Sequence, residues 1–144
     1  MDTPQEPAGN PPPPHRPELT PTEIEAQLTQ FTGSENYYRH WTGALVYTDG
    51  VKAMAELCGA YWLIDAIASW QPQCRKDPML RQIQFWTLKR TDEGHWLLYV
   101  ERDTDDLAFR QQIEFSDFPL SEIKLYAAAG GPGGAMVLML PSEY

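Results

Sequence analysis

Residues 96–115 read Trp-Leu-Leu-Tyr-Val-Glu-Arg-Asp-Thr-Asp-Asp-Leu-Ala-Phe-Arg-Gln-Gln-Ile-Glu-Phe, and this stretch decides the fold class. From 95 to 100 and from 109 to 115 the side chains alternate with a period of two, which is typical of half-buried β-strands. The polar segment Asp103–Asp106 between the two runs is a strong turn signal. The stretch therefore predicts two antiparallel strands joined by a tight acidic turn.

Three further segments of the second half have strand character. They are residues 83–90, 123–127 and 135–140, and glycine-, proline- or aspartate-rich turns separate them from their neighbours. Short strands with tight turns favour an antiparallel meander of about five strands. One face of such a sheet needs cover, and the N-terminal half has the helical periodicity to supply it. We therefore predict a two-layer α+β fold with N-terminal helices packed on the sheet.

The first half predicts helices. Thr20-Pro21-Thr22-Glu23 has the capping-box spacing of a helix start, and apolar residues then recur at helical intervals as far as Phe31. We expect a second short helical turn from Glu35 to about Trp41. A longer helix begins near Val51, with Thr48 or Asp49 as its cap. Gly59 interrupts this pattern and predicts a kink or a close contact before the helix resumes over 60–70.

Residues 1–20 form a proline-rich tail outside this pattern. Eight of the thirteen prolines lie between Pro4 and Pro21, and Met1 and Leu19 are the large apolar residues of the segment. A segment of this composition buries too little surface to offset the entropy lost on ordering. We expect a disordered tail at 1–20 and a single domain at 21–144.

Charge and cysteine content exclude several functions. The net charge is −9, from 20 acidic and 11 basic residues, so direct binding to a nucleic-acid backbone is unfavourable. Cys58 and Cys74 form neither a disulfide framework nor a zinc-binding pattern. The sequence contains no membrane-spanning run and no signal peptide. We predict a cytoplasmic protein with reduced thiols, no metal site and no cofactor.

Asp65 is the charged residue inside the most apolar stretch of the chain, between Glu56 and Arg75. On a continuous helix it follows Cys58 by seven positions and Trp62 by three, which places it on the apolar face. A buried carboxylate needs a hydrogen-bonded partner or a proton, because an uncompensated charge costs several kcal/mol. We expect a structural contact with Arg39, His40 or a backbone amide; the alternative is a general acid or base whose pKa is raised by burial.

Tyr37-Tyr38-Arg39-His40-Trp41 combines three aromatic rings with a guanidinium and an imidazole. Such a set binds a partner or an anionic ligand, and all five residues are our candidates for partner binding. The structural interpretation, which the residues favour, is that the tyrosines and Trp41 pack beneath the sheet while Arg39 or His40 pairs with a carboxylate. His40 and Asp65 are the candidates for catalysis if the protein is an enzyme.

The glycine-rich loop Gly130-Gly131-Pro132-Gly133-Gly134 resembles a phosphate-binding loop only superficially. It lacks the Lys-Ser/Thr pair of a P-loop, and a predicted strand follows it where a P-loop precedes a helix. We therefore interpret it as a hairpin tip.

Four segments of the chain resemble those of a family of small bacterial and phage proteins known as a domain of unknown function. They are residues 28–35, 47–51, 59–69 and 140–144, and the resemblance extends over about residues 26–144. It implies a bacterial, cytoplasmic, mobile-element context and carries no activity, ligand or catalytic residue with it.

These observations favour a small non-enzymatic binding or regulatory protein that engages a protein partner through the Tyr37–Trp41 segment and the acidic hairpin tips. The alternative is a small enzyme with a pocket between helices and sheet. In it, Asp65 and His40 would act as acid and base, and Arg39 would bind an anionic substrate.

Overall fold

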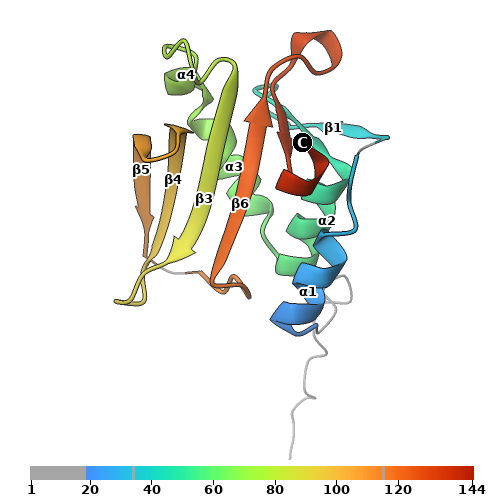
Figure 1. Ribbon diagram of the computed structural model, residues 1–144, viewed down its shortest axis with the longest axis vertical. Coiled ribbons are helices and arrows are strands. Elements are labelled where there is room, and N and C mark those ends of the chain that lie inside the picture. Colours follow the sequence, from blue (N-terminus) through green and yellow to red (C-terminus); the bar gives the residue numbers. More distant parts are fainter. Residues whose placement is uncertain (1–18, 34, 115) are drawn as a thin grey trace, which may run out of the picture.

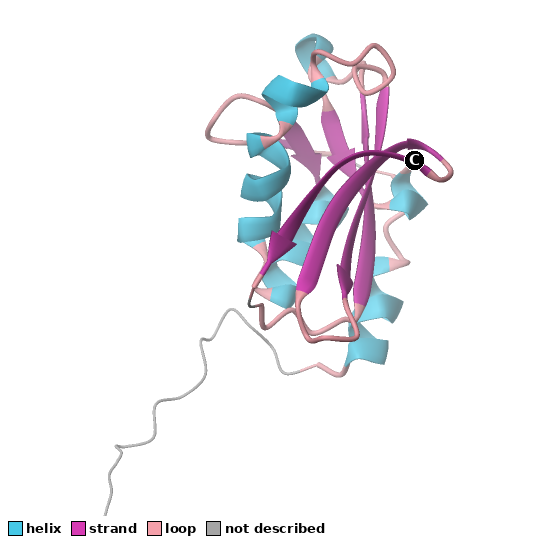
Figure 2. Cartoon of the chain, turned by 90° about the vertical axis from the view of Figure 1, so that its left-hand side faces the viewer, coloured by secondary structure: helices cyan, strands magenta, loops and turns pink. Residues whose placement is uncertain are grey.

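A computed structural model describes residues 19–33, 35–114 and 116–144, and the predicted tail lies outside these residues except for its last two positions. The fold is α+β, with four α-helices and one seven-stranded sheet in the described chain. Figure 1 shows the sheet with α3 (Tyr61–Ser69) behind β3 (Ile83–Arg90) and β6 (Glu122–Ala128). Figure 2 shows the helices flanking the twisted strands.

The helices begin and end at residues that account for their limits. Thr20 caps α1 (Pro21–Leu28), and the reciprocal bonds between Thr20 and Glu23 confirm the predicted capping box. Thr48 caps α2 (Asp49–Cys58) by accepting the Val51 N–H. Gly59 ends α2 with a φ of 61°, a left-handed conformation that glycine adopts without steric cost.

After Gly59 the chain starts a new helix instead of continuing the old one. This helix, α3 (Tyr61–Ser69), is followed by the short α4 (Gln71–Cys74), which has Pro72 in its first turn. The predicted interruption at Gly59 is confirmed. Asp65 was placed on the apolar face under the assumption that one continuous helix runs through Gly59, and that assumption is wrong.

The sheet has the strand order β1-β2-β7-β6-β3-β4-β5. The strands are β1 (Tyr37–Arg39), β2 (Val46–Thr48), β3 (Ile83–Arg90), β4 (Trp96–Asp103), β5 (Asp106–Ile113), β6 (Glu122–Ala128) and β7 (Val137–Met139). The acidic turn between β4 and β5 is present as predicted, and Asp105 in it has a φ of 59°.

The predicted five-stranded antiparallel meander is wrong, because the sheet has two more strands and is mixed. β2 pairs in parallel with β7, so that Val46 lies opposite Val137, and β1 pairs antiparallel with β2. The predicted helical turn at 35–41 is instead the edge strand β1. β1 and β2, of three residues each, show too little alternation to be recognised, and they form here because β7 provides a partner from the far end of the chain.

One cluster of buried side chains joins helices and strands. It contains Ile24 of α1, Met54 of α2, Ile67 of α3, Trp86 of β3 and Leu125 of β6, all at 2% exposure or less. Cys58 and Cys74 are both buried in the same cluster. Burial raises the pKa of the Cys74 thiol to about 11, so this cysteine is a core residue and a poor nucleophile.

The C-terminal turn caps the start of α2. The Glu143 carboxylate accepts the Thr48 hydroxyl at 2.6 Å and the backbone N–H groups of Leu140 at 3.0 Å and Gly50 at 3.2 Å. A β-carbon at Gly50 would lie 2.5 Å from Oε1 of Glu143, so an alanine there would force this carboxylate to move. Two of the segments that carried the family resemblance, 47–51 and 140–144, therefore form one hydrogen-bonded unit.

Candidate functional site

The Tyr37–Trp41 segment lies at the edge of the sheet and divides into two sets of side chains. Tyr37 and Arg39 are exposed, and Trp41 in the following turn is 82% exposed. Tyr38 is half-buried and His40 is buried. The alternation of a strand produces this division, whereas the predicted helical turn would have grouped the residues differently.

Tyr38 is held against α2. Its hydroxyl donates to Oδ1 of Asp49 at 2.9 Å, and Nζ of Lys52 lies 4.9 Å from the centre of its ring. The hydrogen bond to Asp49 raises the pKa of Tyr38, because ionisation would place two negative charges side by side. The ring of Tyr47, the cross-strand neighbour of Tyr38, lies 5.6 Å away. Tyr38 therefore supports the edge strand from the helix side.

His40 links the edge of the sheet to α3. Its Nε2 lies 2.6 Å from Oδ1 of Asp65, and its Nδ1 accepts the Thr42 N–H at 3.2 Å and lies 2.7 Å from the Thr42 hydroxyl. Since Nδ1 is the acceptor of the backbone N–H, Nε2 carries the proton that is donated to Asp65. The predicted contact between His40 and Asp65 is confirmed, whereas Arg39, the other predicted side-chain partner, is exposed.

The predicted burial of Asp65 is wrong. The Asp65 side chain is 53% exposed, and its partner His40 is the buried member of the pair at 4%. The cause is the break at Gly59: α3 has its own orientation, and it buries Leu63, Ile64, Ile67 and Ala68 while Asp65 lies on the opposite side. Asp65 therefore keeps much of its hydration and contacts His40 from the surface of the protein.

Asp65 also orients Trp41. The indole N–H of Trp41 donates to Oδ1 of Asp65 at 3.3 Å, and the Trp41 ring lies 5.4 Å from the His40 ring. Thr42 completes the arrangement, and its role was missed in the sequence because a single threonine in a turn has no distinguishing pattern. The turn that carries Trp41 is thus fixed by hydrogen bonds although the indole itself is exposed.

Acidic and aromatic groups surround this turn. The Tyr61 hydroxyl donates to Glu56 at 3.1 Å. Burial, together with the hydrogen bond and charge of Glu56, raises the pKa of Tyr61 to about 12. Burial and the charges of Asp65 and Glu56 raise the pKa of Tyr47. The region thus combines tyrosine rings with the carboxylates of Glu56 and Asp65.

Replacement of Asp65 by alanine tests the link between α3 and the sheet edge. We expect a loss of about 1–2 kcal/mol in the free energy of unfolding, because the buried Nε2–H of His40 loses its acceptor. Asp65→Asn keeps an acceptor oxygen and should cost less. Urea unfolding monitored by circular dichroism measures both. Asp92→Ala, which changes an exposed aspartate in the β3–β4 turn, is the control; an equal effect there would show that the His40 contact is not stabilising.

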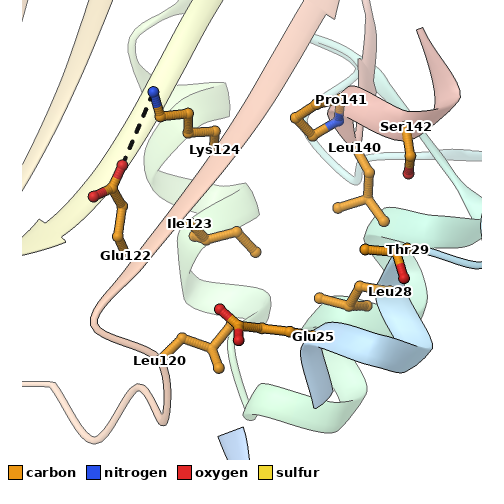
Figure 3. A pocket seen from close by; sticks show the side chains of 10 residues that line it. All are labelled: Glu25, Leu28, Thr29, Leu120, Glu122, Ile123, Lys124, Leu140, Pro141 and Ser142. Atoms are coloured by element: carbon orange, nitrogen blue, oxygen red, sulfur yellow. Dashed lines mark ion pairs between the residues drawn. The ribbon is translucent and has the colours of Figure 1, made fainter. Parts of the chain in front are cut away.

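A groove between α1 and β6 is a second surface feature, and no sequence pattern predicted it. It has a volume of about 420 Å³ and an apolar lining that includes Leu28, Leu120, Ile123 and Leu140. Figure 3 shows how it opens where β6 and the C-terminal turn diverge. The pairing of β6 with β7 begins only at Tyr126, because the chain turns away at Pro141. Its residues come from three distant segments, so no local pattern could reveal it.

Two features are absent from the described chain: a metal-binding cluster and a membrane-spanning helix. Residues 19–33, 35–114 and 116–144 contain no group of three or more His, Cys, Asp or Glu side chains placed to hold a metal ion. Within the same residues, no helix has the length and apolar character needed to cross a membrane.

The fold and its surface define a small α+β domain with a mixed seven-stranded sheet and an aromatic sheet edge. The chain belongs to a family of unknown function (DUF6876), whose model matches residues 22–144. The predicted resemblance to a family without assigned function is thereby confirmed. Comparison with curated proteins and with solved structures found no match.

Proposed function

We propose that this protein is a non-enzymatic binding module that engages a protein partner through the exposed side chains of Tyr37, Arg39 and Trp41. We call these three residues the β1 surface. The observation that carries the proposal is Trp41, which is 82% exposed while its turn is held by the His40–Asp65 contact. Trp, Tyr and Arg are the residue types that most often dominate the binding energy of protein interfaces.

Pre-organisation supports this proposal. An indole that is already oriented by Asp65 loses less conformational entropy on binding than a free side chain would. The arrangement places a large apolar ring mostly in water, which lowers solubility and gives the fold little packing beyond the contact with the His40 ring in return. A partner that covers Trp41 would remove that cost.

The position of β1 defines how a partner would bind. Among the described residues, β1 is the end strand of the sheet and pairs with β2 alone, so its outer edge could accept an added strand. The nearby carboxylates of Glu56 and Asp65 and the net charge of −9 favour a partner with basic side chains. We therefore propose an extended, basic segment of another protein as the partner.

Replacement of Trp41 by alanine tests the proposal. We expect the fold to be unchanged and the affinity for the partner to fall by about 30-fold or more, the effect of losing a tryptophan hot spot. Tagged wild-type and Trp41→Ala proteins would be compared in capture experiments from cells that express the protein naturally. The affinity of each purified candidate would then be measured by calorimetry.

Leu107→Ala is the matched control, because Leu107 is a 48% exposed apolar residue on β5, at the opposite edge of the sheet. The Leu107→Ala protein should capture the partner as well as wild type does. A partner bound equally by wild type and Trp41→Ala, or lost equally in Leu107→Ala, would contradict the proposed surface.

The enzyme alternative has one specific observation in its favour. The Thr42 hydroxyl, the His40 imidazole and the Asp65 carboxylate form an array with contacts of 2.7 Å and 2.6 Å, the order of groups that activates a hydroxyl nucleophile. Both imidazole nitrogens are occupied in this array, so a substrate would have to reach Thr42. Covalent labelling of Thr42 by a fluorophosphonate in wild type and not in Asp65→Ala would favour the enzyme over the binding module.

A further inference from the structure

A cavity of about 300 Å³ lies at the end of the sheet where α4 and the loop after β6 meet. Arg75 follows α4, Arg81 precedes β3, and Gly134 belongs to the glycine-rich loop; all three line the cavity. These residues are distant in the sequence, and the proposed β1 surface does not include any of them. The cavity is at the lower end of the size range of small-molecule sites.

Arg75 and Arg81 are exposed residues, and neither has a carboxylate partner in the described chain; no Asp or Glu is among the residues that line the cavity. Arg102 provides the contrast, because it binds Asp77 at 2.6 Å and Asp106 at 2.9 Å. In a chain with 20 acidic and 11 basic residues, two arginines at one cavity without an acid form a local positive site. A guanidinium without a carboxylate has its hydrogen-bond donors available to an anion.

A pair of buried amides forms the floor of the cavity. Gln71 and Gln84 are 2% and 0% exposed and exchange two hydrogen bonds, of 3.0 and 2.9 Å. The remaining N–H groups of the two amides donate to the carbonyls of Ile67 and Leu80, and Oε1 of Gln84 accepts the Trp86 indole N–H. The floor is therefore fixed in place, and its amide N–H groups already donate hydrogen bonds within the protein.

The glycine-rich loop forms one wall. Gly134 has a φ of +80°, and a β-carbon built there would meet no atom within 4 Å, so the backbone can be approached closely. The turn is closed by bonds from the N–H groups of Gly134 and Ala135 to the carbonyls of Gly131 and Pro132. The sequence lacks the lysine of a phosphate-binding loop, and the fold places two arginines beside this loop instead.

We infer that this cavity binds a phosphate monoester with a small apolar organic group. The three terminal oxygens of a phosphate monoester can accept from two guanidinium forks, whereas one fork already satisfies both oxygens of a carboxylate. Leu80 and Met136 also line the cavity and offer an apolar contact to the organic group. The inference is independent of the partner proposed for the β1 surface.

Calorimetric titration at constant ionic strength tests the inference with three probes: inorganic phosphate, phenyl phosphate and benzoate. We expect phenyl phosphate to bind more tightly than either of the others. Arg75→Gln and Arg81→Gln should each weaken phenyl phosphate binding by about tenfold or more, because each removes charge-assisted hydrogen bonds. Arg75→Lys and Arg81→Lys keep the charge without the fork and should be intermediate.

Arg110→Gln is the matched control, because Arg110 lines another cavity together with Lys89, Glu101 and Asp105. Arg110→Gln removes the same charge and should change the affinity for phenyl phosphate by less than about twofold, which is the size of a screened long-range charge effect. The inference is overturned if phenyl phosphate does not bind at about 10 mM, if benzoate binds as tightly, or if Arg110→Gln weakens binding as much as the cavity variants. Circular dichroism of every variant verifies the fold before titration.

Discussion

Gln84→Leu is expected to lower the free energy of unfolding by about 3–5 kcal/mol, the larger of the two main effects that we predict. The leucine has a similar volume but no polar atoms. It leaves the Trp86 indole N–H, the Leu80 carbonyl and the Gln71 amide without the partner that each has in the core. Each buried group without a partner costs about 1–3 kcal/mol. The free energy of unfolding of a small domain is about 5–15 kcal/mol in total, so the Gln84→Leu variant should be close to unfolding.

Urea unfolding of wild type and Gln84→Leu measures this loss. Gln82→Leu is the matched control, since it makes the same chemical change at an exposed position two residues earlier. We expect it to change stability by less than about 0.5 kcal/mol. Equal stability of the two variants would contradict a stabilising role for the buried amide pair.

The double variant Gln71→Leu/Gln84→Leu sharpens this experiment. Because the two amides share two hydrogen bonds, the double variant should lose less stability than the sum of the single changes. Additive losses would show that the amides act independently of each other.

Glu143→Ala is expected to cost about 2–4 kcal/mol, the second of the large effects. The substitution removes the acceptor of the Thr48 hydroxyl and of the backbone N–H groups of Leu140 and Gly50. It also removes a negative charge from the N-terminus of α2, where the helix dipole favours an anion. Glu143→Gln should lose about half as much, because one amide oxygen remains but an NH₂ group faces the Gly50 N–H.

Thermal and urea unfolding measure the effect, with Glu93→Ala in the exposed β3–β4 turn as the control. Gly50→Ala should be at least as damaging as Glu143→Ala. Its β-carbon would displace the same carboxylate and also lie 2.8 Å from Cδ1 of Leu140. Unchanged stability in both Glu143→Ala and Gly50→Ala would show that the C-terminal turn does not contribute to the fold.

The long strands of the second half were predicted most accurately, and the three-residue strand β7 lies within its predicted segment 135–140. The eight-residue strand β3 has the predicted limits, and β6 extends its prediction by one residue at each end. β1 and β2 were missed because each has three residues, which is less than two periods of strand alternation. A pairing such as Val46 with Val137 also depends on the closure of a long loop, which no local pattern describes.

The predictions for the candidate site divide in the same way, between local features that were recognised and contacts of distant residues that were not. The composition around Asp65 singled out that residue, and His40 was one of the three partners expected for it. The exposure of Asp65 was predicted wrongly because a single glycine changed the orientation of the helix that carries it. The groove beside α1 and the arginine-lined cavity had no counterpart in the sequence-based prediction, since each combines residues from separate segments.

The amino-acid sequence by itself determined the α+β class, the capped start of α1 at Thr20, the end of α2 at Gly59 and the long strands of the sheet. These features depend on capping, glycine conformation and side-chain periodicity, which act over a few residues. The tertiary structure alone decided the strand order, the burial of His40 in place of Asp65 and the partners of Glu143 and Gln84. These depend on which distant groups meet when the core is packed, because buried polar groups select partners by position in space and not by distance along the chain.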